Sequence, residues 1–305
     1  MDIKLIFKIY LIFGITFSYS QTYQDVLRYN SYNHEGTSRF NSMGGAFGAL
    51  GGDLSSISIN PAGSSIFLDS EFGVTLNYKN QEIKNIFNNS QSLSKDDLLS
   101  YNNIGLVLVY GNNRSKFSLG YNMNRLNDYN SSFSFNGKNS IGIDSYFLDY
   151  STGVPSSNLS VFDGESIQSV YKALGDSYGY GDQQAFLGYQ SYLINHVDDL
   201  PNNYVSNALY SNVDQLLSID RKGDHLVHSL NLSTSYNDNV YLGLNFNFHS
   251  LEFEEYKFFK ESGYSSNSNV KRVQFEENLF SYGQGLSIQL GSLLKFNNFR
   301  VGLSY

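Results

Sequence analysis

The 305-residue sequence contains no cysteine and no tryptophan, only three prolines, and only 16% charged side chains. Without cysteine it cannot form a disulfide framework, a thiolate metal site or a cysteine nucleophile. Its net charge of −8 comes with no block of basic residues, which argues against a protein that neutralises nucleic-acid phosphates. Ordinary domains carry about 25% charged residues. An acidic chain that is nevertheless poor in charge, and rich in Tyr and Phe, therefore needs a structural explanation.

Long apolar runs are also missing. Residues 1–20 begin with Lys4 and Lys8, continue with an apolar run over 9–17 and end in the small-x-small triplet 18–20. This order is typical of a cleaved secretory signal peptide, and the run is shorter than the roughly 20 residues that span a bilayer. No later stretch is long enough to be a transmembrane helix. An exported chain of this kind is either soluble outside the inner membrane or crosses an outer membrane as a β-barrel.

Apolar residues alternate with small or polar ones along much of the mature chain, which predicts β-strands. The run 240–249 is the clearest, because aliphatic and Phe residues alternate there with Gly, Asn and other polar residues. Short Asn-rich turns and long alternating pieces favour an antiparallel outer-membrane barrel over a soluble sandwich, which would turn every 8–12 residues. The candidate strands are 71–80, 103–110, 116–136, 225–236, 240–260, 271–296 and 299–305.

Two segments do not follow the strand pattern. Residues 21–70 are glycine-rich and only weakly periodic, and residues 140–222 form a long insertion between strands. Within the insertion, two apolar stripes at helical spacing predict short amphipathic helices packed as an extracellular cap. The alternative is a loosely ordered polar loop. The two stripes are Ile167, Val170, Tyr171 and Leu174, and Val205, Leu209, Val213 and Leu216.

The glycine-rich segment 40–53 ends in Asp53 and leads to the sequence Asn60-Pro61-Ala62-Gly63. It strongly resembles the N-terminal region of the FadL/OmpP1/TodX family of outer-membrane transport proteins, in the form found in Bacteroidetes. The family places an Asp several residues before an Asn-Pro-Ala-Gly signature. The later segments 239–243, 281–285 and 300–305 agree with the family as well, so the resemblance extends over nearly the whole mature chain.

The resemblance implies an all-β fold: a transmembrane antiparallel β-barrel of 14 strands with an N-terminal luminal hatch and a partly helical extracellular insertion. Residues 1–20 would be the signal peptide, 21–70 the hatch and 71–305 about half of the barrel, with 140–222 as the insertion. Bacterial single-chain barrels close with an even number of strands. We therefore expect a C-terminally truncated sequence that cannot form a stable pore alone.

The function implied by the resemblance is passive uptake of hydrophobic small molecules, such as long-chain fatty acids or aromatic hydrocarbons, across the outer membrane of a Gram-negative bacterium. The implied partners are this cargo, outer-membrane lipid and the barrel-assembly machinery, and the full-length protein would be monomeric. Cap aromatics are candidates for capturing cargo. The implied hatch residues are Asn60, Pro61, Ala62 and Gly63 with Gly51, Gly52 and Asp53, and the capture candidates are Phe147, Phe162, Tyr171, Phe186 and Tyr204.

Other functions find less support. Some relatives of the family bind or shuttle exported proteins, and a soluble secreted β adhesin is a further alternative. No G-x-S-x-G or H-E-x-x-H motif is present, so neither an enzyme nor a metal or other cofactor is expected. Residues 44–52 lack the G-K-[ST] ending of a phosphate loop. His225 and His228 would lie on opposite faces of a strand. The acidic residues at 198–199 and 252–255 are more typical of solvated or lumen-facing positions than of a calcium site.

Overall fold

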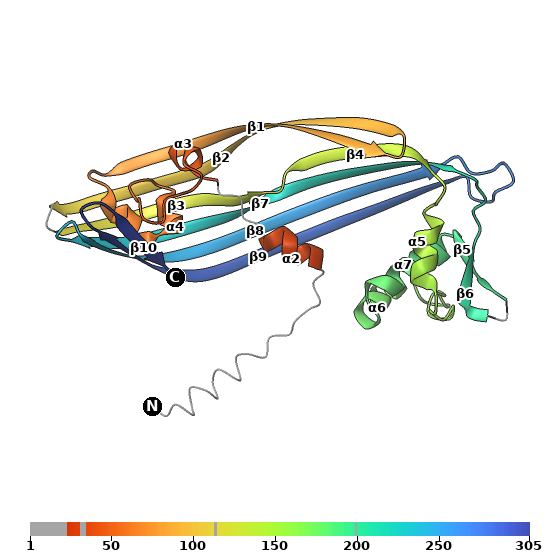
Figure 1. Cartoon of the computed structure of the whole chain (residues 1–305). Coiled ribbons are helices and arrows are strands. Elements are labelled where there is room, and N and C mark those ends of the chain that lie inside the picture. Colours follow the sequence, from red (N-terminus) through yellow and green to blue (C-terminus); the bar gives the residue numbers. More distant parts are fainter. Residues whose placement is uncertain (1–22, 31–34, 113–114, 199) are drawn as a thin grey trace, which may run out of the picture. The chain divides into compact units, whose positions relative to one another are not determined.

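The computed structural model describes residues 23–30, 35–112, 115–198 and 200–305 (Figure 1). The chain divides into two compact units, residues 1–34 and residues 35–305. In the first unit, the helix α2 (Tyr23–Asn30) contains an ion pair between Asp25 and Arg28 at 2.9 Å. The predicted signal peptide and the residues of the predicted hatch at 21–22 and 31–34 lie outside the described residues.

Most of the second unit is one antiparallel sheet whose strands follow one another in chain order. The strand β4 (Ser131–Asn139) continues β3 after a break at residues 129–130, because β3 pairs with residues 224–236 of β7 and β4 pairs with residues 213–221. The sheet thus has seven strand positions, and the seven predicted strands are confirmed. The other strands are β1 (Glu71–Phe87), β2 (Ser90–Asn112), β3 (Ser115–Asp128), β7 (Val213–Tyr236), β8 (Val240–Ser262), β9 (Arg272–Lys295) and β10 (Arg300–Ser304).

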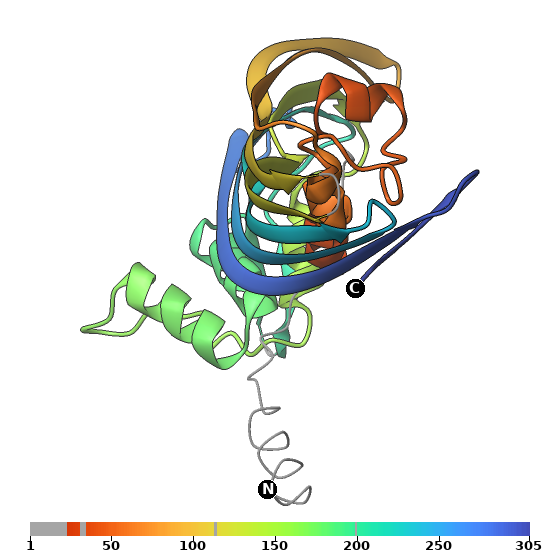
Figure 2. The ribbon, with the colours of Figure 1, turned by 90° about the vertical axis from the view of Figure 1, so that its left-hand side faces the viewer.

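Seen end-on, this sheet curls into an open half-barrel, with residues 35–70 inside the curl (Figure 2). The expected all-β class is confirmed, and the closed 14-stranded barrel stays a prediction. Among the described residues, β1 and β10 are the two edges of the sheet, each paired on one side. Alternation makes the two faces different. Outward residues such as Leu286 and Ile288 are exposed, whereas inward residues such as Asn231 and Asn245 are buried.

The strand boundaries correct the sequence analysis at β1 and β2. Residues 81–102, which were not predicted as strand, form the outer half of a long hairpin that turns at residues 88–89. Asn88 has a left-handed φ of 51°, which Asn tolerates better than most residues. The outward positions here mix the polar Glu82, Lys84 and Lys95 with the apolar Leu93 and Leu99. Because of this mixture, the apolar alternation that identifies a half-buried strand is lost.

The chain between β4 and β7 forms a separate small module, which we call the cap (residues 140–212). Helix α6 confirms the predicted stripe at Ile167–Leu174. The second predicted stripe is wrong, because Val205 lies in β6 and both Val213 and Leu216 lie in β7, so the insertion ends before residue 213 rather than at 222. No helix among the described residues is long and apolar enough to cross a membrane. The cap elements are α5 (Asp144–Ser151), α6 (Ile167–Ser177), α7 (Tyr180–Gln190), β5 (Ile194–Val197) and β6 (Leu200–Ser206).

Candidate functional site

The concave face of the sheet holds residues 35–70, which we call the inner segment. It folds into three short turns of helix, α3 (Ser38–Ser42), α4 (Ser56–Ile59) and the 3₁₀ helix η1 (Pro61–Ile66). Thr37 caps α3, because its Oγ1 accepts a hydrogen bond from the Phe40 amide. The same hydroxyl contacts both carboxylate oxygens of Asp53 at 2.8 Å. These side chains join the start of the inner segment to its middle.

The two motifs predicted to act together are in direct contact. Gly51 and Gly52 both have a φ of +65°, a conformation that glycine adopts without strain. The Gly52 amide donates to the Gly63 carbonyl at 3.0 Å, and a Cβ on Gly51 would lie 2.9 Å from that same oxygen. Asp53 is buried and accepts from the Ser55 amide at 2.9 Å. The glycine pair therefore lets the backbone pack against Asn60-Pro61-Ala62-Gly63.

Asn60 is the junction between the inner segment and the wall. Its side chain is 1% exposed, and its Oδ1 accepts from the Ala62 amide at 3.1 Å, which caps η1. Its Nδ2 donates to the Gly48 carbonyl at 2.8 Å and to the Ser292 carbonyl on β9 at 3.0 Å. Pro61 follows at the first position of η1, where the missing amide hydrogen costs nothing. One amide side chain thus holds two parts of the segment and one strand.

Wall glycines face the inner segment at its closest approaches, a feature that the sequence analysis missed. A Cβ on Gly243 of β8 would overlap the Pro61 backbone, and one on Gly291 of β9 would overlap the Asn60 side chain. A Cβ on Gly302 of β10 would overlap the carbonyl of Gly48. The available signal was that all three glycines stand at polar-face positions of their strands. Because these three glycines have no side chains, the inner segment can lie directly against the wall at these positions.

Uncharged polar side chains complete this interface. Asn231 donates to the Pro61 carbonyl at 2.9 Å, and Asn245 donates to the Ile57 carbonyl at 2.8 Å. Gln289 donates to the carbonyls of Ser58 and Ile59 at 3.3 and 3.2 Å. Amides satisfy buried backbone carbonyls without the desolvation cost of a charge. This explains why the inner face is polar while the chain as a whole is poor in charge.

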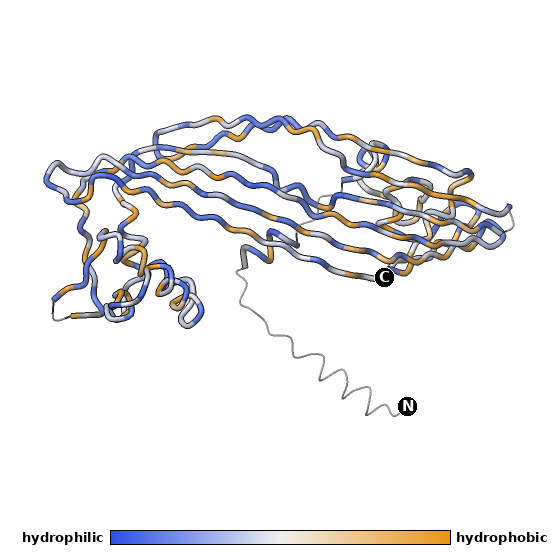
Figure 3. The backbone as a smooth tube through the Cα atoms, turned by 180° about the vertical axis from the view of Figure 1, so that it is seen from behind, coloured by the Kyte–Doolittle hydropathy of each residue, from blue (hydrophilic) through white to orange (hydrophobic). Residues whose placement is uncertain are grey.

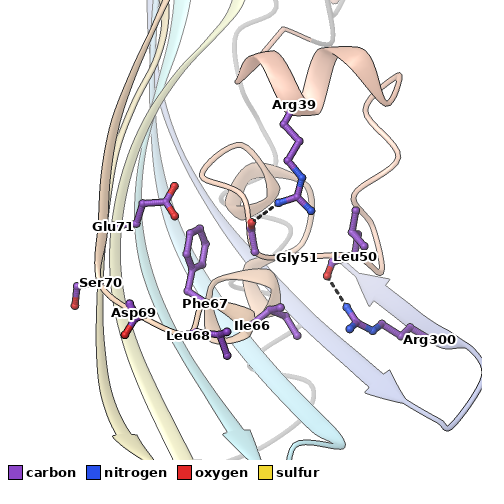
Figure 4. A pocket seen from close by; sticks show the side chains of 11 residues that line it. Arg39, Leu50, Gly51, Ile66, Phe67, Leu68, Asp69, Ser70, Glu71 and Arg300 are labelled. Carbon is purple, nitrogen blue, oxygen red and sulfur yellow. Dashed lines mark hydrogen bonds between the residues drawn. The ribbon is translucent and has the colours of Figure 1, made fainter.

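Two arginines that the sequence analysis did not single out hold the glycine-rich loop from opposite sides (Figure 4). Arg39 of α3 donates to the Gly52 carbonyl and Arg300 of β10 donates to the Leu50 carbonyl, each at 2.9 Å. An open cavity of about 440 Å³ lies beside them. Its lining also includes the apolar Ile66, Phe67 and Leu68 and the acidic Asp69 and Glu71. Isolated arginines gave no sequence pattern from which this arrangement could be predicted.

The backbone ladder of the wall is interrupted between β2 and the broken strand β3–β4. The ladder between β2 and β3 runs from residues 112 and 115 only as far as the pair Asn103 and Asn124. Beyond it, side chains join the β1–β2 hairpin to β4. Ser92 and Asn85 donate to the Ser134 carbonyl at 2.5 and 3.1 Å. Side-chain bonds of this kind can open without unzipping a backbone ladder.

The five candidate capture residues do not form one surface. Phe147 is 3% exposed and Phe186 is fully buried, and they belong to two different clusters of the cap interior. Tyr171 and Tyr204 are half-buried against the second cluster. Only Phe162 is exposed, at 61%. Phe147 and Phe186 thus pack inside the cap, because a module this small needs its large aromatics for its own core, and the capture role stays a prediction.

Tyrosines join the cap to the wall. Tyr180 of α7 donates to Glu277 of β9 at 2.7 Å, and its hydroxyl lies 2.9 Å from that of Tyr146 on α5. Burial raises the pKa of Tyr146 to about 12. Burial, followed by the hydrogen bonds to Tyr146 and Glu277, also raises the pKa of Tyr180. Both phenols are therefore neutral donors at ordinary pH, and they connect two cap helices to one strand.

The remaining polar candidates also have defined places. His228 lies on the outward face, 2.8 Å from the Tyr121 hydroxyl, whereas His225 is buried, 3.3 Å from His249, so the predicted opposite faces are confirmed. Glu255 is buried and pairs with Arg221 at 2.6 Å. In the described part of the chain, no three His, Asp or Glu side chains are grouped so that they could hold a metal ion.

Comparison of the chain with protein family models, with curated proteins and with solved structures finds no match.

Proposed function

We propose that this protein is a FadL-like outer-membrane channel for the passive uptake of hydrophobic small molecules, such as long-chain fatty acids or aromatic hydrocarbons. The observation that carries the proposal is the outward face of β9. It is polar from Arg272 to Asn278 and aromatic at Phe280 and Tyr282. After the polar Gln284 it is mainly aliphatic from Leu286 to Leu294, with Ser292 as the exception. Water-soluble monomers rarely expose apolar surface in a band of this length. An aliphatic band bordered by aromatic residues suits a barrel wall in lipid.

The band continues on the neighbouring strand at the same height. On β8 the outward residues are apolar from Leu242 to Phe248 and become polar at Ser250 and Glu252. The ladder pairs Phe248 with Leu286 and Glu252 with Tyr282. The outward faces of the two strands therefore stop being aliphatic or Phe-rich at the same level. The apolar residues lie in the half of the sheet that ends in the short turns (Figure 3). Residues 286–294 are close to the about 9–11 that a tilted transmembrane strand needs.

A route for cargo follows from this placement. The inner segment would act as the hatch, and the cap would stand at the outer mouth. The side-chain contacts between the β1–β2 hairpin and β4 lie level with the polar part of β9, outside the apolar band, so cargo would leave through the lumen. The contacts between the inner segment and the wall support the hatch role. They are hydrogen bonds and close glycine contacts, and they include the bonds of Asn60 with Ser292 and of Arg300 with Leu50.

The proposal is tested by expressing the complete reading frame that contains this chain in a Gram-negative host, separating the membranes, and measuring uptake of a fluorescent fatty acid and of a neutral aromatic hydrocarbon. We expect the protein in the outer-membrane fraction and faster uptake of at least one probe than with an empty vector. We expect Asn60→Ala or Pro61→Ala to change that rate while Asn89→Ala, in the exposed β1–β2 turn, does not. Recovery in the soluble fraction, or uptake equal to the empty vector, would overturn the proposal.

A further inference from the structure

Nearly all of the net charge of this protein lies in the cap. Residues 140–212 contain eight acidic side chains and one basic side chain, so their net charge is 1 − 8 = −7, against −8 for the whole chain. The wall, hatch and N-terminal residues together are almost neutral. The basic residue is Lys172, and the acidic residues are Asp144, Asp149, Asp163, Glu165, Asp176, Asp182, Asp198 and Asp199.

The cap also has an open apolar groove. It has a volume of about 390 Å³ and lies between the loop at 157–165 and helix α6. Val170 and Leu174 line it from α6, and Phe162 and Tyr178 are exposed at 61% and 65%. Two large aromatic side chains at the rim of one groove in a water-facing module are unusual, because each exposes apolar area that burial against a partner would stabilise.

Local hydrogen bonds hold both walls of the groove. The Phe162 amide donates to the Glu165 carboxylate at 3.0 Å, which fixes the loop. Ser166 and Ser169 form a reciprocal capping box at the start of α6, with bonds of 3.0 and 3.1 Å. A groove held in this way needs little reordering when a partner binds, so less of the binding free energy is lost to ordering it.

The charges around the groove favour a polycation over a single ion. Glu165 lines the groove, Asp163 is exposed beside it, and Asp176 at the far end of α6 is paired with the exposed Lys172 at 2.5 Å. Asp163 and Glu165 stand on the loop and Asp176 stands on α6, and no three acids are grouped to hold a metal among the described residues. One small cation therefore cannot neutralise them, whereas spaced Lys or Arg side chains can.

We propose that the cap binds a basic peptide segment of a partner protein, which places one apolar side chain in the groove beside Phe162 and Tyr178 and Lys or Arg residues beside the flanking acids. The proposal rests on the charge and the groove of the cap and does not depend on uptake of cargo. The same negative charge repels anionic lipid headgroups and nucleic acid.

The test uses the full chain in detergent and three labelled ten-residue peptides measured by fluorescence anisotropy. One has Lys and Arg around a central Leu-Phe pair, one has Glu and Asp around the same pair, and one has Lys and Arg around Ser-Ser. We expect binding of the first at least tenfold tighter than of either other peptide, weakening when NaCl is raised from 50 to 250 mM. Equal binding of the two basic peptides would show attraction by charge alone and would overturn the proposal.

Variants locate the site. We expect the double substitution Phe162→Ser and Tyr178→Ser to weaken binding of the first peptide at least fivefold, and Glu165→Gln with Asp163→Asn to do the same. The matched controls are Tyr192→Ser and Asp198→Asn, which are exposed on the cap outside the groove and are expected to change binding less than twofold. Equal losses in groove and control variants would contradict the site. Because the readout is binding, it can fail while uptake succeeds, or the reverse.

Discussion

The side-chain amide of Asn60 donates a hydrogen bond to the backbone carbonyl of Ser292 at 3.0 Å, although the two residues are 232 positions apart in the sequence. Asn60 lies at the start of η1 and Ser292 lies near the end of β9. The same nitrogen also holds Gly48. The first residue of the predicted hatch signature is thus bonded directly to the wall.

Replacing Asn60 by Ala is expected to destabilise the protein by on the order of 2–3 kcal/mol, because buried carbonyls and an amide lose their partner. Urea unfolding in detergent, followed by circular dichroism, measures the change. Asn89→Ala, at an exposed turn, is the control and is expected to stay within about 0.5 kcal/mol. An equal loss of unfolding free energy in the two variants would show that the hydrogen bonds of Asn60 do not stabilise the protein.

Adding one methyl group at a wall glycine should move the inner segment at one position and not at another. Gly243→Ala places a Cβ on the Pro61 backbone, so we expect a loss of about 1–3 kcal/mol and faster hydrogen exchange over residues 56–66. Gly283→Ala on the same face is the control, because its Cβ would come no closer than 3.9 Å to Leu251. If exchange in the segment rises equally in both, the contact at Gly243 does not position it.

The cap is expected to loosen at alkaline pH. A free tyrosine ionises near pH 10, whereas burial raises the pKa of Tyr146, Tyr204 and Tyr210 to about 12. The folded cap therefore keeps these protons while the unfolded cap loses them. Their contribution to stability is complete below about pH 10 and is lost as the pH rises toward about 12. A titration of tyrosinate absorbance at 295 nm checks this, and a single transition near pH 10 for all tyrosines would contradict it.

Two phenylalanines of the cap should differ sharply in their effect on stability. Phe186→Ala removes a fully buried ring from the cluster around Leu174 and is expected to cost about 3–5 kcal/mol. Phe162→Ala removes an exposed ring and should change stability by about 0.5 kcal/mol or less. Hydrogen exchange over α6 and α7 measures both. Similar exchange in the two variants would mean that the cap interior does not depend on Phe186.

Alternation predicted the wall where one face is apolar, as at Val240–Phe248, because period two is visible only when the two faces differ. It failed over residues 81–102, since the outward face there mixes polar side chains such as Glu82 with apolar ones such as Leu93 and Leu99. The apolar residues from Val205 to Leu216 imitate a helical stripe by chance. They belong to two strands, β6 and β7, and the loop between them. Local spacing cannot separate these cases, and pairing with β8 decides the conformation of β7.

The candidate site was predictable in part. The contact between Gly51-Gly52-Asp53 and Asn60-Pro61-Ala62-Gly63 follows from two compact motifs a few residues apart. Arg300 and Gly243 could not be assigned to the same interface, because each is defined by a partner about 180 residues or more away and neither has a motif of its own.

The contacts of the inner segment also set an order of assembly. Leu50 receives its bond from Arg300, which is 250 residues later in the chain, and Gly48 faces Gly302. During synthesis from the N-terminus, the segment is made first, and Arg300 is made 250 residues after Leu50. Long-range contacts of this kind form slowly because the intervening chain must first be ordered. The inner segment can therefore complete its contacts with the wall only after β9 and β10 have formed. Its docking thus follows the formation of these two strands.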